Sequence, residues 1–362
     1  MPQQRSPAFA LAGGRTDTSF DAIGYGSFPL MVLASREPKE CVMPDVETVR
    51  GPVPAEQLGT VLMHEHVFVR SEEIQRNLPE TWDEEAEVAA AEEKLAALAG
   101  RGVRTLVDAT VIGLGRDVAR VARVNGAVDL NIIVATGVYT YSDVPYYFQY
   151  RGPGTLLGGD EPMVDLFVRD LTDGIADTGI KAAFIKCAVE DRLTPGVERV
   201  LDAVAVTHAR TGAPIMVHTS AQAGTGLVAQ RALKERGVDL GAVVIGHCGD
   251  TADLDYVRRI IDNGSYAGMD RFGLDVFLPY EVRMSAVAKL AGEGFADRMM
   301  LSHDYSCHFA PLPPGVREAV APNWHYTFLS DTVIPGLRGL GVTEEQLTTM
   351  LVENPRSYFC GS

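Results

Sequence analysis

Residues 61–66 read VLMHEH, an apolar run that ends in two histidines two positions apart. In a β-strand, residues i and i+2 point to the same face, so His64 and His66 can reach one metal ion while Glu65 faces away. Imidazole nitrogens are common ligands of zinc and related divalent metals. This stretch therefore predicts a buried strand that carries a metal-binding pair.

Four later apolar runs also end in a residue suited to such a site. They are followed or closed by Lys186, His218, His247 and Asp304. A single histidine after an apolar run is usually a core residue, but five runs that end this way are hard to explain by packing alone. We expect these residues to share one site.

Lysine is the exception in this set, because an ammonium group cannot bind a metal. After reaction with CO2, however, Lys186 would become a carbamate anion that can bridge two metals. The alternative is a core lysine paired with a neighbouring carboxylate. The four histidines at equivalent places in the sequence favour the bridging interpretation.

The rest of the chain alternates short apolar runs with amphipathic stretches. The expected strands are 61–66, 104–109, 131–136, 180–186, 214–218, 242–247, 265–269 and 299–303. The expected helices between them are 84–99, 117–124, 164–176, 197–210, 227–236, 254–263 and 282–291. Eight such units in about 300 residues predict a (β/α)8 TIM barrel. Active sites of these barrels form at the C-terminal ends of the strands, where the candidate ligands would meet.

Composition and charge exclude several classes of protein. The net charge of −16 argues against binding to nucleic acid, and no apolar run approaches the about 20 residues of a membrane span. The five cysteines are scattered, without a Cys-x-x-Cys pair, which favours a reducing, cytoplasmic location. Residues 113–115 (GLG) lack the third glycine of a dinucleotide-binding loop, and the sequence has no Gly-x-Ser-x-Gly or His-Glu-x-x-His motif.

The first 46 residues differ from the rest, since Gly, Ser, Pro, Arg and Asp interrupt every short apolar run. We interpret residues 1–46 as a poorly ordered N-terminal extension and residues 47–362 as the barrel. One alternative is upstream sequence added by a mis-set start, with Met43 as the true first residue. A cleaved signal peptide is the weaker alternative, because the longest apolar run, 28–34, is late and short.

Several motifs together resemble the phosphotriesterase family of the amidohydrolase superfamily, and within it the phosphotriesterase-like lactonases. The resemblance covers roughly residues 47–359. It rests on TVRGP at 48–52, HEH at 64–66, VATGVY at 134–139, IKCA at 185–188, IGHCGD at 245–250, GMDRFG at 268–273, LSHD at 301–304 and ENP at 353–355.

The resemblance implies two divalent metal ions in each subunit, with zinc favoured over iron, cobalt or manganese. His64, His66 and Asp304 would hold the buried metal, and His218 with His247 the exposed one. Lys186, as N6-carboxylysine, would bridge them. His208, His303, His308 and His325 stay outside this set, the last two as expected loop residues.

The resemblance also implies the catalytic residues. Asp304 would accept a proton from the attacking hydroxide, and Tyr139 would orient a lactone ring. Arg271 would contact the loop or the ligand. The expected activity is lactone hydrolysis, mainly of N-acyl-homoserine lactones, which would quench quorum signals, with weak phosphotriesterase activity.

Two alternatives to this function remain. One is a phosphotriesterase whose main substrates are organophosphate triesters. The other is a barrel that binds ligands without catalysis, against which the intact ligand set argues. Enzymes of this family commonly form homodimers, and the aromatic-rich residues 143–152 are the expected interface, since Tyr and Phe are enriched in such surfaces.

Overall fold

The computed structural model describes residues 45–79 and 82–361 of the chain. The predicted extension therefore falls almost wholly outside the described residues. The described chain begins with two short antiparallel strands, β1 (Asp45–Val46) and β2 (Val53–Pro54). The remaining strands are β3 (Thr60–Val69), β4 (Val103–Asp108), β5 (Asn131–Gly137), β6 (Phe184–Val189), β7 (Ile215–Thr219), β8 (Val243–Ile245), β9 (Tyr266–Met269), β10 (Met299–Leu301) and β11 (Ser306–Phe309).

These nine strands form one parallel sheet in the order β10-β9-β8-β7-β6-β5-β4-β3-β11. The segment after β10 returns to β3 and closes the sheet. There the Asp304 amide donates to the His64 carbonyl at 2.9 Å, and the His66 amide donates to the Tyr305 carbonyl at 2.8 Å. The predicted (β/α)8 barrel is thereby confirmed.

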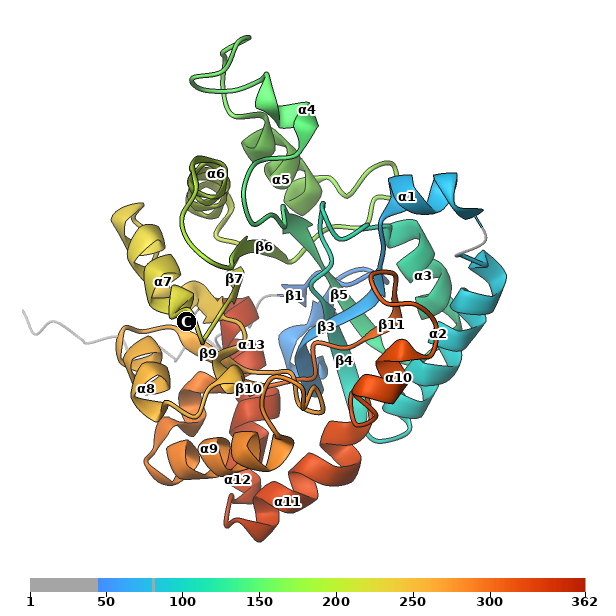
Figure 1. The fold of residues 1–362 in the computed structure, drawn as a ribbon, viewed down its shortest axis with the longest axis vertical. Coiled ribbons are helices and arrows are strands. Elements are labelled where there is room, and N and C mark those ends of the chain that lie inside the picture. The colour runs from blue at the N-terminus through green and yellow to red at the C-terminus, as the bar shows by residue number, and fades with distance from the viewer. Residues whose placement is uncertain (1–44, 80–81, 362) are drawn as a thin grey trace, which may run out of the picture. The chain divides into compact units, whose positions relative to one another are not determined.

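Helices follow most strands and surround the barrel (Figure 1). Those of the barrel layer start at side-chain caps such as Asp83, Asp117, Thr194 and Asp253, which accept hydrogen bonds from the first-turn amides. The helices are α1 (Glu72–Asn77), α2 (Glu84–Ala99), α3 (Val118–Ala127), α4 (Tyr146–Gln149), α5 (Pro162–Thr172), α6 (Pro195–Thr211), α7 (Thr225–Glu235), α8 (Leu254–Asp262), α9 (Tyr280–Gly292), α10 (Val316–Val320), α11 (Ile334–Gly339), α12 (Glu344–Thr348) and α13 (Asn354–Cys360). In residues 45–79 and 82–361, none of them combines the length and apolar character needed to cross a bilayer.

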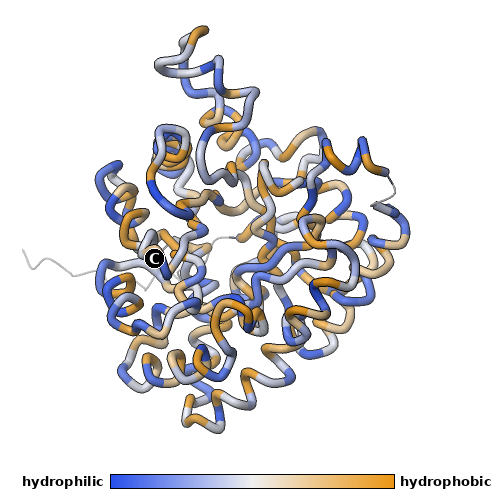
Figure 2. The backbone as a smooth tube through the Cα atoms, in the orientation of Figure 1, coloured by the Kyte–Doolittle hydropathy of each residue, from blue (hydrophilic) through white to orange (hydrophobic). Residues whose placement is uncertain are grey.

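The strands separate two hydrophobic cores, one inside the barrel and one under the helices. On β7, Met216 belongs to the inner core, whereas Ile215 and Val217 belong to the outer one. This alternation is the period of two that a strand imposes on its side chains. Figure 2 shows the result, with hydrophobic strands at the centre and hydrophilic stretches along the outer helices. The inner core forms the floor on which the inward-facing polar residues rest.

A register shift in β3 allows two consecutive residues, Met63 and His64, to contribute to the inner core and to the polar site respectively. The pairing of β3 with β4 shifts between Leu62 and Glu65. Such an irregularity inserts an extra residue and changes which side chains face inward. Met63 therefore packs in the inner core while His64, the next residue, points to the polar site.

The predicted strand 180–186 is displaced, and this part of the prediction is wrong. The strand β6 begins at Phe184 and continues to Val189, so Lys186 lies inside it. The physical reason is a tertiary contact, because the Ala182 amide donates to the carbonyl of Asp170 at the end of α5. The residues before Ala183 thus lead into the sheet, and the first hydrogen bond to β5 is donated by the Ala183 amide to the Val134 carbonyl.

Candidate metal and active site

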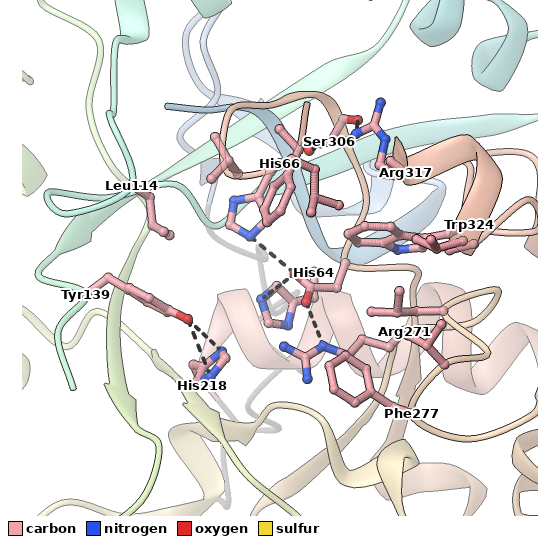
Figure 3. Close-up of a pocket in the computed structure, with 18 of the residues that line it drawn as sticks. His64, His66, Leu114, Tyr139, His218, Arg271, Phe277, Ser306, Arg317 and Trp324 are labelled. Atoms are coloured by element: carbon pink, nitrogen blue, oxygen red, sulfur yellow. Dashed lines mark hydrogen bonds and ion pairs between the residues drawn. The ribbon is translucent and has the colours of Figure 1, made fainter. Parts of the chain in front are cut away.

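The predicted site residues converge on a cavity of about 340 Å³ at the C-terminal end of the barrel (Figure 3). Its walls include seven of the eight residues proposed from the sequence, namely His64, His66, Tyr139, Lys186, His218, Arg271 and Asp304. The eighth, His247, is fully buried and contacts His218 from behind. The structure therefore brings the whole predicted set together.

His64, His66 and Asp304 form the first group of ligand atoms. The Nε2 atoms of His64 and His66 lie 3.5 and 3.3 Å from the same oxygen of Asp304. The three side chains have donor atoms within 4.8 Å of one another, which is the geometry of a metal-binding group. Figure 3 shows the imidazoles of His64 and His66 at the centre of the cavity.

His218 and His247 form a second pair beside the first group. The Nδ1 atom of His218 and the Nε2 atom of His247 are 2.8 Å apart. The rings of His64 and His247 stack with centroids 4.9 Å apart, so the two groups adjoin. Lys186 adjoins the first group, with Nζ 2.7 Å from Nε2 of His64.

Asp270 joins the two groups, although it was not among the candidate ligands predicted from the sequence. One carboxylate oxygen lies 2.8 Å from Nδ1 of His64, and the other lies 2.9 Å from Nδ1 of His247. The amide of His247 also donates to this carboxylate. Burial alone would raise the pKa of Asp270, but the two histidines outweigh it and hold that pKa far below its ordinary value. Asp270 thus orients both rings with Nε2 directed into the site.

His66 and His218 each have one ring nitrogen within hydrogen-bond distance of a neighbouring side chain. Nδ1 of His66 lies 2.8 Å from the hydroxyl of Thr110, and Nε2 of His218 lies 2.6 Å from the carboxylate of Glu190. Neither partner stood out in the sequence, because each belongs to a loop far along the chain from its histidine. Every histidine of the set is therefore oriented by a second residue.

Burial keeps the nitrogen ligands in the form that binds metal. Desolvation lowers the pKa of His64 and His247 and brings that of His218 to about 4. Desolvation also lowers the pKa of Lys186 to about 8. Neutral imidazoles and a readily deprotonated amine are the chemistry that a divalent metal pair and a carbamate require. The donor set present in this chain therefore fits two metal ions.

Arg271 is fixed by two carboxylates at the edge of the cavity. Its Nε atom donates to Asp304 at 2.9 Å, and its Nη1 atom donates to Asp250 at 2.8 Å. Arg283 holds the other oxygen of Asp250. Burial opposes ionisation of Asp304. Electrostatic interactions with His64, His247 and Arg271 outweigh this effect and keep the pKa of Asp304 well below its ordinary range. Arg271 thus stabilises Asp304 as a carboxylate.

Three site residues have a backbone conformation that is rare for residues with a side chain. Among the described residues other than glycine, positive φ angles occur at Ala176, His247, Arg271 and Asp304. Such angles cost free energy and persist where the surrounding structure enforces them. Their concentration at the ends of β8, β9 and β10 marks this edge of the barrel as the functional one.

Tyr139 and Tyr141 form one wall of the cavity, after β5. Their hydroxyl groups are hydrogen-bonded to each other, and the Tyr139 hydroxyl lies 3.5 Å from the His218 ring. Burial raises the pKa of both phenols, so they are hydrogen-bond donors at neutral pH. Tyr141, to which the sequence analysis assigned no role, also lines this cavity.

The opposite wall is apolar and comes from the segments after β9 and β11, including the end of α10. It includes Leu274, Val276, Phe277, Leu312, Val320 and Trp324. The guanidinium of Arg271 lies over the Phe277 ring at 5.3 Å. The cavity thus combines a polar floor with an apolar wall, as expected for a small amphipathic ligand.

The excluded histidines stay outside the cavity, but one lies elsewhere than expected. His308 belongs to β11, so its prediction as a loop residue is wrong. It was missed because β11 is short and its pairing with β3 depends on closure of the barrel. His303 is buried beside Asp304, where it contacts Glu65.

Comparisons with known proteins agree with this architecture. The model of the phosphotriesterase family matches residues 44–359. The solved structure of the phosphotriesterase from Mycobacterium tuberculosis has 56% identity and a TM-score of 0.86, covering 87% of this chain and 98% of that one. The aryldialkylphosphatase of Saccharolobus solfataricus is 38% identical over 310 residues, 85% of this chain and 96% of the relative.

A further solved structure concerns organophosphate hydrolysis engineered from a weak promiscuous lactonase template. It is 35% identical, with a TM-score of 0.80, and covers 87% of this chain and 99% of that one. The matched range contains every residue of the site described above.

Proposed function

Because the chain belongs to the phosphotriesterase family, whose members are metal-dependent hydrolases of ester and phosphoester bonds, we propose that it is a lactonase. Its preferred substrates are N-acyl-homoserine lactones, and phosphotriesters are hydrolysed as weak secondary substrates. The observation that carries this proposal is the position of Tyr139, whose hydroxyl faces the His218 ring in a cavity with an apolar wall.

The metal centre of the family corresponds in this chain to the two groups of histidines. His64, His66 and Asp304 hold one ion, and His218 with His247 hold the other. The low pKa of Lys186 provides a neutral amine, whose Nζ atom bonds to the carbon of CO2 with loss of one proton. The carbamate of Lys186 would be a further anionic ligand for the two ions. Zinc would suit the histidine and carboxylate ligands best, with iron, cobalt and manganese as alternatives.

Divalent ions bound there supply hydroxide at neutral pH and polarise the substrate oxygen. The chain's own residues handle the proton. Asp304 is ionised and held by Arg271, so it can accept the proton released during attack and pass it to the leaving alkoxide. Arg271 keeps the Asp304 carboxylate directed at this position.

Substrate orientation depends on the two walls of the cavity. The Tyr139 hydroxyl donates a hydrogen bond to the lactone ester, while Tyr141 fixes the Tyr139 side chain. The acyl chain lies along Leu274, Phe277 and Leu312, where it buries apolar surface. A lactone with an acyl chain can therefore form the hydrogen bond with Tyr139 and the apolar contacts with the opposite wall at the same time.

A phosphotriesterase with organophosphates as its main substrates is the second candidate, supported by the similarity to the aryldialkylphosphatase. Comparing kcat/KM for an N-acyl-homoserine lactone and an aryl dialkyl phosphate on the metal-loaded protein distinguishes the two. We expect the lactone value to be larger. A larger triester value would replace the lactonase proposal by the second candidate, and hydrolysis of neither would favour a binding protein.

We also propose a cytoplasmic homodimer. Buried Cys187, Cys248 and Cys307 are thiols outside any disulfide, as suits a reducing compartment. In the expected interface, 143–152, the side chains of Tyr146 and Tyr147 are 73% and 61% exposed on α4, which projects from the barrel (Figure 1). Phe148, which we expected to be exposed, is buried and anchors the helix.

The dimer is tested by the mass in light scattering. Replacing Tyr146 and Tyr147 by serine should convert a dimer to a monomer, whereas Leu340→Ser, at another exposed apolar residue, should not. A wild-type monomer at micromolar concentration would contradict the dimer.

A further inference from the structure

Glu65 lies between His64 and His66 in β3, but its side chain forms hydrogen bonds with His303 and Tyr305 and not with either of these histidines. Its side chain is fully buried and points to the opposite face of the strand. One carboxylate oxygen accepts hydrogen bonds from the His303 amide and from Nδ1 of His303, both at 2.8 Å. The other accepts from the Tyr305 amide at 2.9 Å. Glu65 therefore holds the peptide groups on both sides of Asp304.

His303 extends this connection to the cavity wall. Its Nε2 atom accepts a hydrogen bond from the Leu329 amide at 2.9 Å, so the proton on Nδ1 must be the one directed at Glu65. The His303 carbonyl accepts from the indole of Trp324 at 2.7 Å. The imidazole of His303 thus joins Glu65 of β3 to Leu329, and the carbonyl of the same residue holds Trp324, which lines the cavity.

Asp304 requires such support because its backbone is unfavourable. Its φ angle is 54°, and its own amide donates to the His64 carbonyl. A residue with a side chain keeps this conformation only when its surroundings enforce it. The hydrogen bonds of Glu65 to both neighbouring residues provide that constraint.

We propose that Glu65 is a positioning residue that fixes the carboxylate of Asp304 toward His64 and His66 by holding the flanking peptide groups. The inference rests on the proposed role of Asp304 as a metal ligand. Glu65 acts through Asp304 and touches neither the substrate nor the metal-binding atoms. It therefore controls how long a metal is retained as well as how fast the enzyme works.

Glu65→Gln tests this role with little change in side-chain volume. The amide presents one acceptor oxygen and one NH2 group, so at least one of the backbone donors around Asp304 loses its acceptor. We expect zinc to be lost to a chelator about 10–100-fold faster than from wild type, the usual range for partners that orient a ligand. In the metal-free protein, the amides of His303 and Tyr305 should exchange hydrogen faster.

Asp170→Asn is the matched control. Asp170 is also fully buried and accepts hydrogen bonds from Arg116 and Thr136 at 2.8 Å, but it contacts none of the predicted ligands. It should lower the melting temperature while leaving zinc release unchanged. Zinc release at the wild-type rate from Glu65→Gln, or acceleration in both variants in proportion to lost stability, would overturn the proposal.

A second pair of variants keeps the test decisive if Glu65→Gln does not fold. Glu65→Asp shortens the carboxylate, and His303→Gln removes the imidazole while leaving Glu65 in place. Faster zinc release from either supports the proposal, and wild-type release from both overturns it. A wild-type protein that holds no metal would overturn the proposed function and this inference together, whereas an insensitive Glu65 would overturn only the inference.

Discussion

The two halves of the cavity differ in how they are held. The ligand half consists of the candidate metal ligands, which lie on the strands or directly after them, and it is buried, with Lys186 at 1% and His247 at 0% exposure. The apolar wall lies on loops, and Val276 and Phe277 are 60% and 55% exposed. Each histidine is oriented by a hydrogen bond to a second residue, whereas Val276 and Phe277 are more than half open to solvent. We therefore expect changes in the wall to alter substrate preference without disturbing the groups proposed to carry out hydrolysis.

The largest effect is expected from Lys186→Ala, which acts on the ligand half. Removing the bridging group should release both metals and abolish hydrolysis of lactones and triesters alike, a loss beyond the about 10–100-fold typical of an outer partner. Metal analysis and both assays check this, with short carboxylates added to restore activity in part. Lys181→Ala, which removes a partly exposed lysine nearby, should behave as wild type. Two metals retained by Lys186→Ala would refute the bridge.

Tyr139→Phe acts on the other half and should separate the two substrates. If the hydroxyl contact strengthens in the transition state, its loss should lower the lactone kcat by about 10²–10³-fold. The triester has no such ring, so its rate should change far less. Tyr147→Phe, on exposed α4, is the control. Equal losses on both substrates would mean that Tyr139 only supports the ligand half.

Asp270→Asn should have a smaller effect, again common to both substrates. An amide has one acceptor oxygen, so it can orient His64 or His247 but not both. Zinc affinity should fall by about 10–100-fold, measured by competition with a chelator. An unchanged affinity would show that the backbone alone orients the two rings.

Phe277→Ala should have the smallest effect, restricted to the acyl chain. Loss of about 1 kcal/mol of apolar contact should raise KM about fivefold for a long-chain lactone and leave a short-chain lactone unchanged. Kinetics with two chain lengths on one variant measure this directly. A change in kcat for the short chain would show that the loop also affects the ligand half.

The sequence predicted which of these residues meet at the edge of the barrel, because alternation and strand ends are local signals; their role as metal ligands stays a prediction. Apolar runs followed by His, Lys or Asp indicated both the barrel and the residues that meet at its edge. It misplaced β6, since the contact of Ala182 with the α5 carbonyl is tertiary. It also missed the role of Asp270, which lies 206 residues from His64 in the chain. Such pairs arise only when the barrel closes.

The loops were predicted less well for a related reason. Tyr141 and Phe148 belong to one aromatic segment, yet the first lines the cavity and the second is buried under α4. Composition alone does not distinguish these positions. The expectation for residues 1–46 remains a prediction, which a protein that starts at Met43 would test by its solubility and lactonase activity.

The claim that the strand residues hold two metals is tested most directly by anomalous diffraction from crystals of the zinc-loaded protein. We expect two peaks, one against His64, His66 and Asp304 and the other against His218 and His247. Electron density for a carboxylate on Nζ of Lys186 should join them. A single peak, or zinc bound by Asp270 in place of these residues, would contradict the account.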